Sequence, residues 1–222
     1  MTETLFSALK ISLLVASTAT LMIAVFGLFL AYVLARRDFR GKHLLDALIT
    51  IPMVLPPTVV GYFLVVLLGR EGVIGGPLYR LTGWSFVFTW QGAAIAAFVV
   101  ALPLMVRVSR AAMESVDEDL IRISYSLGKS ERETFFRIIL PLSKGGIMAG
   151  TILAFARALG EFGATLMIAG NIPGKTSTLA LSIYSAFQTG NDDLAKTLAI
   201  ILTSISGTVI YLAGKWTKSR WM

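Results

Sequence analysis

Two charged side chains lie four residues apart inside an apolar stretch where we expect a membrane helix over about residues 145–169. They are Arg157 and Glu161, and Thr165 continues the same spacing. A charge at the centre of a bilayer costs about 2.5–3.5 kcal/mol, so these groups should face protein or water and pair with each other. Two roles fit. The pair can lock helices around a pore in a structural or gating role, or Arg157 can present positive charge to an oxyanion.

Prolines inside other apolar stretches form a second candidate site. Pro56 and Pro57 directly precede Thr58, and the same stretch also contains Pro52. Proline removes a backbone donor and kinks a helix, and the freed carbonyls must be satisfied by protein or water. Pro56, Pro57 and Thr58 therefore predict a broken helix that lines a translocation path and bends at a gate. The alternative is a static packing kink.

The polar segment of about residues 107–144 is far longer than a turn between two membrane helices requires. Acidic residues at 117–119 suit a helix start because they complement the helix dipole. Gly128 is placed to end that helix in a left-handed conformation. The segment is therefore expected to begin with a helix that ends at Gly128.

A second helix is expected directly after this glycine. Ser130 and Glu133 have the spacing of a capping box, and the helix should run to about Ile139 before Pro141 stops it. The result is a helix–Gly–helix elbow that either docks a partner or packs on its own membrane domain. The apolar side chains available for docking are Ile121, Ile123, Leu127, Phe135 and Phe136.

Patterns typical of catalysis fail in this sequence. Residues 170–176 suggest a phosphate loop, but they have one residue too few between the glycines. There is no cysteine, and a lone His43 cannot form a metal cluster. A membrane-embedded enzyme would need catalytic groups clustered at one depth, and Arg157 with Glu161 is too few. We expect no catalytic residue, metal or cofactor in this chain.

The elements that must position these groups are membrane helices. The 222 residues are 55% hydrophobic and 15% charged, with a mean hydropathy of +0.75. Soluble domains carry roughly a quarter charged residues, so a soluble enzyme is excluded. We predict an all-α bundle of about five transmembrane helices forming a single domain over 1–222. The apolar stretches that reach the necessary length of about 20 residues are 11–35, 44–69, 84–106, 145–169 and 194–214.

The distribution of positive charge predicts the orientation. Fourteen of the twenty Lys and Arg residues fall at 36–43, at 107–144 and in the C-terminal tail, which alternate to one side. Because positive loops stay in the cytoplasm, the N-terminus should be outside and the C-terminus cytoplasmic. The net charge of +7 then needs no nucleic acid as a partner. Residues 176–190 are too short and hydroxyl-rich to span, and we expect an external or re-entrant helix there.

The elbow resembles a known family. Gly128, nine residues and then Ile138-Ile139-Leu140-Pro141 are similar to the core motif in permease subunits of binding-protein-dependent ABC importers. This chain departs from the family motif at Arg122-Ile123-Ser124, where the family has Glu-Ala-Ala. The resemblance implies a type I ABC importer permease fold in which this loop couples to an ATPase. The coupling residues it implies are Glu118, Arg122, Ile123, Ser124, Leu127, Gly128, Lys129, Ile138, Leu140 and Pro141.

Three longer segments narrow the resemblance to molybdate permeases, whose relatives transport sulfate and tungstate. They cover residues 39–42, 51–61 and 155–165. The resemblance implies a homodimer in a prokaryotic inner membrane that carries an oxyanion, with molybdate as the first choice. It also implies two ATPase subunits that bind ATP-Mg and an external oxyanion-binding protein as partners. A stand-alone channel or secondary transporter is the alternative, and it predicts an inverted repeat that the sequence lacks.

Overall fold

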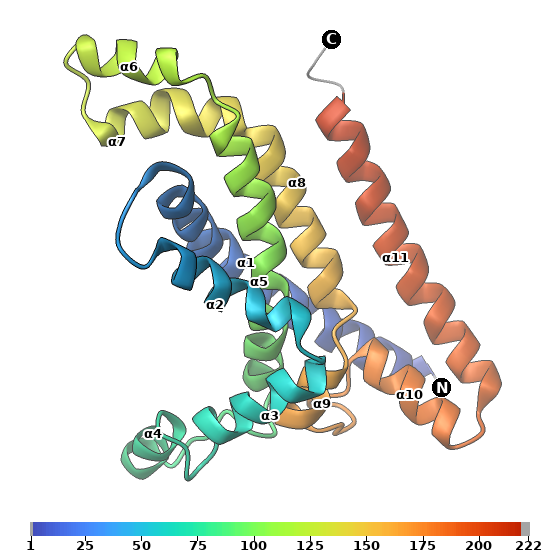
Figure 1. The fold of residues 1–222 in the computed structure, drawn as a ribbon. Helices are drawn as coiled ribbons and strands as arrows, with labels where there is room; N and C mark the ends of the chain where they lie inside the picture. Colours follow the sequence, from blue (N-terminus) through green and yellow to red (C-terminus); the bar gives the residue numbers. More distant parts are fainter. Residues whose placement is uncertain (1, 219–222) are drawn as a thin grey trace.

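A computed structural model describes the backbone of residues 2–218 and the side chains of residues 5–212, 214 and 215. Within this range every regular element is a helix, as predicted (Figure 1). In chain order the helices are α1 (Thr2–Arg36), α2 (Lys42–Val54), α3 (Pro57–Leu68), α4 (Gly75–Thr82), α5 (Trp90–Glu114), α6 (Glu118–Ser126), α7 (Glu131–Thr134), the π-helical turn η1 (Phe135–Ile139), α8 (Leu140–Leu159), α9 (Gly163–Ala169), α10 (Leu179–Gln188) and α11 (Asp192–Lys218).

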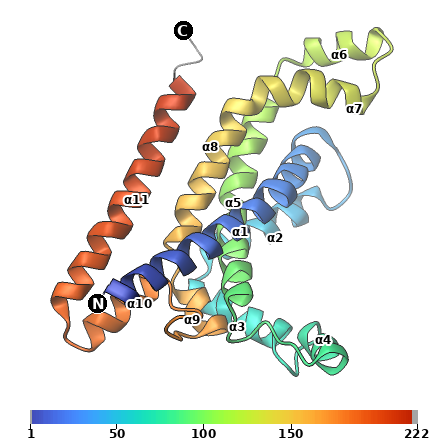
Figure 2. The same ribbon diagram turned by 180° about the vertical axis from the view of Figure 1, so that it is seen from behind.

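The centre of the molecule is the packing of α1, α5 and α8, and Figure 2 shows α1 crossing the other two obliquely. Small residues let these helices approach closely, as is usual in membranes. Gly146 of α8 faces Ala112 of α5, and Gly150 faces Met105. The inner face of α5 is rich in buried alanines. These small residues allow close backbone contact, and large side chains such as Ile23 and Leu159 fill the rest of the core.

The expected number of about five membrane-spanning segments is confirmed. Four helical segments are long and apolar enough to span, and the pair α2–α3 makes a fifth if it is counted as one bent span. The four are Leu5–Arg36, Trp90–Glu114, Glu131–Leu159 and Asp192–Leu212. Helix α11 contacts α8 and α10, and most of its surface is not covered by other helices, as Figure 1 shows.

The second expected span, 44–69, is not a single kinked helix. It breaks into α2 and α3, which meet at 116°. Leu55 still donates to Ile51 (3.0 Å), but Pro56 and Pro57 have no N–H to continue the hydrogen-bond ladder. Pro56 is therefore extended, and Pro57 begins α3. The predicted break at Pro56 and Pro57 is therefore present, as a sharp bend between two separate helices.

The expectation of one continuous helix over 145–169 is wrong. Helix α8 ends at Leu159 and α9 begins at Gly163, so Glu161 lies in the break between them. The Oε1 atom of Glu161 accepts a hydrogen bond from the backbone N–H of Ala164 (2.9 Å) at the start of α9. A carboxylate in this position satisfies a free donor and complements the helix dipole. Arg157, Glu161 and Thr165 are four residues apart in the sequence, but they lie in α8, in the break and in α9, respectively.

Two boundaries of the polar segment 107–144 also differ from expectation. Helix α5 continues to Glu114, so Arg107 and Arg110 belong to it rather than to the loop. Pro141 does not stop the second elbow helix, because Glu131–Leu159 runs on as one helical segment. A π-helical turn directly before the proline accommodates it, because Leu140 donates its hydrogen bond to Phe135, five residues back. Pro141 then lies in the first turn of α8, where its missing N–H is tolerated.

The remaining segments lie at the two ends of the bundle. Residues expected to form a short non-spanning helix at 176–190 form α10. Helix α10 and the start of α1 lie at one end, whereas the elbow and the end of α11 lie at the other (Figure 1). Arg220, which belongs to the predicted positive tail, lies outside the described residues.

Candidate functional site

The two helix breaks of the molecule are in contact with each other. A Cβ atom built on Gly163 would stand 3.2 Å from the side chains of Pro57 and Thr58. One turn further, a Cβ on Gly61 would be only 2.8 Å from the Cα of Ala164. Glycine is therefore required at Gly61 for the backbones of α3 and α9 to touch. We call this contact, formed by Pro56–Thr58, Gly61 and Gly160–Thr165, the double break.

The predicted pair of intramembrane charges is present in the double break. Arg157 Nη1 lies 2.8 Å from Glu161 Oε2, and the side chains are 36% and 2% exposed, respectively. Thr165 does not continue their face, because it belongs to α9; it is buried, and its Oγ1 has no hydrogen-bond partner among the described residues. Pro56 and Thr58, at the junction of α2 and α3, are exposed.

This arrangement joins two helices through one buried carboxylate. Glu161 connects the end of α8, through Arg157, with the start of α9, through Ala164. Arg157 is the one charged group there that remains partly accessible, and its charge is balanced by the carboxylate. No group of three His, Cys, Asp or Glu residues that could hold a metal ion occurs in the part of the chain that the structure describes.

The elbow, residues 117–139, has the caps that the sequence predicts. Asp117 caps α6 by accepting a hydrogen bond from Asp119 N–H (2.9 Å). Gly128 is left-handed with φ of 75°. Ser130 and Glu133 form both hydrogen bonds of the capping box (3.2 Å each), and the Ser130 N–H holds the pKa of the Glu133 carboxyl below its usual value. Both elbow helices are thus fixed by local hydrogen bonds.

The faces of the elbow are only partly as expected. Ile121 is buried and Phe135 packs on Tyr32, so neither is free for docking. Ser124 is also buried, and its hydroxyl hydrogen-bonds that of Thr134 across the two elbow helices (2.8 Å). Ile138 packs in the core beneath the elbow, and Leu140 is half-buried. The predicted coupling residues left exposed are Glu118, Arg122, Ile123, Leu127, Gly128, Lys129 and Pro141.

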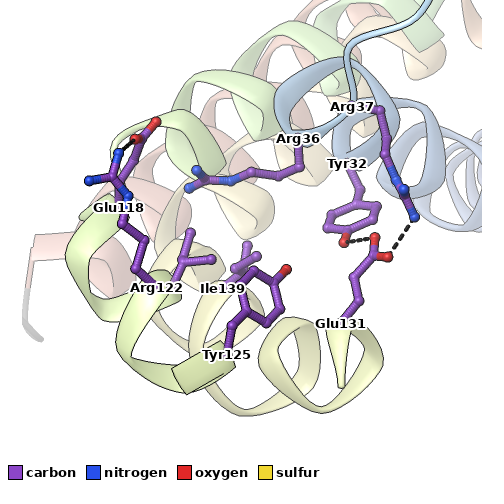
Figure 3. A pocket seen from close by; sticks show the side chains of 9 residues that line it. Tyr32, Arg36, Arg37, Glu118, Arg122, Tyr125, Glu131 and Ile139 are labelled. Carbon is purple, nitrogen blue, oxygen red and sulfur yellow. Dashed lines mark hydrogen bonds and ion pairs between the residues drawn. The ribbon is translucent and has the colours of Figure 1, made fainter. Parts of the chain in front are cut away.

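Contacts that attach the elbow to α1 were not expected. Glu131 accepts hydrogen bonds from the Tyr32 hydroxyl and from Arg37 Nη2, both at 2.6 Å (Figure 3). Arg36 donates to the carbonyls of Met113 and Val116, at the end of α5. These residues are about 80 to 100 positions apart in the sequence, so no local pattern signals them. The positive cluster at Arg36 and Arg37 was assigned only to membrane orientation.

Comparisons with known proteins agree with this architecture. A family model described as "Binding-protein-dependent transport system inner membrane component" matches residues 23–220. The molybdenum transport system permease protein ModB of Escherichia coli (strain K12) is 45% identical over 217 residues, which cover 97% of this chain and 94% of that protein. The sulfate transport system permease protein CysW of Synechococcus elongatus is 35% identical over 205 residues, which cover 92% of this chain and 71% of that protein.

Among solved structures, a bacterial ABC transporter involved in the import of the acidic polysaccharide alginate superposes with a TM-score of 0.81. The two chains are 15% identical, and the match covers 99% of this chain and 81% of the other. The helix bundle with its broken spans therefore has the fold of type I ABC importer permeases. By its sequence, the chain belongs to the family of binding-protein-dependent transport system inner membrane components, and it is a multi-pass membrane protein.

Proposed function

We propose that this chain is the permease subunit of an ABC importer for molybdate and that it works as a homodimer. The assignment of molybdate as the substrate rests on the 45% identity, over nearly the full length of both chains, with a molybdenum transport permease. The sulfate permease relative is 35% identical and is matched over less of its length, so sulfate is the weaker choice. Tungstate shares the tetrahedral dianionic chemistry of molybdate and remains an alternative cargo.

The elbow is the proposed docking site for a separate ATPase, two copies of which serve the dimer and bind ATP-Mg. Its outer face exposes Ile123, Leu127 and Phe136, whereas its inner face is tied to α1 and to the core. An apolar patch on a rigidly capped support fits a protein groove. The charge distribution supports a cytoplasmic position for the elbow, with the N-terminus outside. The oxyanion-binding protein then docks at the opposite end, near α10.

The proposed mechanism uses the continuous helical segment from the elbow to the double break. Closure of the ATPases on nucleotide moves the two elbows together. Because Glu131–Leu159 is one helical segment, that motion reaches Gly160 directly. There the Arg157–Glu161 pair transmits the motion to α9. The tight contact at Gly61 transmits it from α9 to α3. The double break is thus the proposed gate, and it alternates between access from the two sides.

Reconstitution tests this function. The permease, the ATPase and the binding protein are placed in proteoliposomes, and ATP hydrolysis is measured with the binding protein loaded with molybdate, tungstate or sulfate. We expect stimulation by the molybdate-loaded protein, coupled to molybdate uptake. Stimulation by the sulfate-loaded protein alone would assign a different cargo. Molybdate uptake by the permease without its ATPase would instead identify a channel or secondary transporter.

A further inference from the structure

A pocket of 310 Å³ separates the end of α1 from the elbow, far from the double break (Figure 3). The proposed cargo path does not use this pocket, and of the exposed coupling residues only Glu118 and Arg122 line it. It is open to solvent and large enough for several waters, each of which takes about 30 Å³. Its lining combines three arginines, two glutamates and two tyrosines with two isoleucines.

The charges of this pocket do not balance. Three arginines face two carboxylates. Arg37 is paired with Glu131 at 2.6 Å, and Arg122 is paired with Glu118 at 3.2 Å and with Asp119, outside the lining, at 3.8 Å. Arg36 has no carboxylate partner among the described residues. The lining residues alone therefore carry one positive charge in excess, and it belongs to Arg36.

Arg36 also has an unused donor. Its Nη2 donates to the carbonyls of Met113 and Val116, but its Nε is buried without a hydrogen-bond partner in the described part of the chain. Buried, charged N–H groups are normally hydrogen-bonded, and this one has no acceptor among the described protein groups. Figure 3 shows Arg36 reaching across the pocket from α1 toward Arg122 on the elbow. An anion between them would meet guanidinium groups from two elements.

We propose that this pocket binds a small tetrahedral oxyanion, of the phosphate, sulfate or molybdate type. Arg36 is the main contact, because guanidinium N–H groups match the oxygens of such anions. Arg122 and the Tyr125 hydroxyl complete the site from the α6 side. Since Arg36 belongs to α1 and the other two belong to the elbow, a bound anion bridges these elements and stiffens their contact. A free anion and the phosphate of a lipid headgroup share this chemistry.

Binding to the purified full-length permease in detergent tests this site. Equilibrium dialysis with labelled phosphate and molybdate should show one saturable site per chain. Arg36→Gln removes the charge and the free donor, and we expect affinity to fall at least 10-fold. Tyr125→Phe changes only an exposed hydroxyl and should weaken binding about 2- to 5-fold without affecting folding. Arg40→Gln removes an exposed arginine outside the pocket and should leave affinity unchanged.

Two further measurements complete the test. Saturating phosphate should slow amide hydrogen exchange in 118–126 of the wild-type chain but not of Arg36→Gln. In nanodiscs, competition by phosphatidylglycerol but not by phosphatidylcholine identifies a lipid headgroup as the natural occupant, and no competition identifies a free anion. The proposal is overturned if neither anion shows saturable binding. It is equally overturned if Arg36→Gln and Tyr125→Phe bind as the wild type does, or if Arg40→Gln loses as much affinity as Arg36→Gln.

Discussion

The elbow and the double break are both pairs of helices joined by a short interruption, yet different forces shape them. In the elbow each helix start has a side-chain cap within three residues: Asp117 accepts from Asp119 N–H, and Ser130 accepts from Glu133 N–H. Its interruption is a left-handed Gly128 with nothing within 4 Å of an added Cβ. The starts of the elbow helices and the turn between them are therefore specified locally, with space around Gly128, whereas Glu131 and Ile121 attach the elbow to α1 and the core.

In the double break the interruptions are held by segments distant in the sequence. Gly61 touches Ala164, and Gly163 touches Thr58, so each break is supported by the other. Buried charge adds a second constraint, because Glu161 is 2% exposed and has Arg157 as its only ion-pair partner in the described residues. Substitutions in the double break should consequently lower the stability of the fold, whereas substitutions in the elbow should weaken docking of the ATPase.

Removal of Arg157 should have the largest effect. Arg157→Ala leaves Glu161 as a buried, unpaired carboxylate, and loss of one partner of a fully buried pair costs about 3–5 kcal/mol. We expect the lower end of this range for the free energy of unfolding, because the Arg157 side chain is 36% exposed. Thermal unfolding of the purified chain in detergent measures the loss.

A second substitution identifies the cause of that loss. Glu161→Gln keeps an acceptor for the Ala164 N–H and removes the charge. Added to Arg157→Ala, it should restore more than half of the lost stability. If Arg157→Ala unfolds at the wild-type temperature, the pair does not constrain the double break.

Closing the space between α3 and α9 should have the next largest effect. Gly61→Ala places a Cβ 2.8 Å from the Ala164 backbone, which cannot rotate away. Overpacking of this kind costs about 1–3 kcal/mol, so we expect a lower unfolding temperature and little molybdate uptake. Gly207→Ala is the matched control, because that helical glycine of α11 has nothing within 4 Å of an added Cβ. Equal stability of the two variants would refute the tight contact.

The same contrast explains which features the sequence predicts. Apolar length predicts the spans, and the elbow caps follow from residues one to three positions apart, so Gly128 and the Ser130–Glu133 box were placed correctly. The break after Leu159 was missed because α9 is held against α3, about 100 positions away, where Gly163 lies against Thr58 and Gly61 lies against Ala164. The prediction that Pro141 ends the second elbow helix was wrong because a π-helical turn accommodates the proline. The Tyr32–Glu131 contact joins residues 99 positions apart and leaves no local signal.

A substitution at Gly128 should affect docking more than folding. Gly128→Val forces a β-branched residue into a left-handed conformation at φ of 75°, at a cost of about 1–2 kcal/mol that local unwinding of the elbow can relieve. Co-purification of the ATPase should fall, while the unfolding temperature of the bundle changes little. Gly128→Asn tolerates this conformation and should retain the ATPase. Retention of the ATPase by Gly128→Val would show that the elbow geometry does not determine docking.

The most direct test of the account asks whether the double break must open during transport. The chain has no cysteine, so a single disulfide can be introduced cleanly with Thr58→Cys and Gly163→Cys. Thr58 Cγ2 lies 3.2 Å from the position of a Cβ on Gly163, which is close enough for a bond. We predict that oxidation abolishes molybdate uptake in proteoliposomes, that reductant restores uptake to the level before oxidation, and that oxidation changes neither uptake by the single-cysteine variants nor ATPase docking. Undiminished uptake by the cross-linked protein would contradict the account.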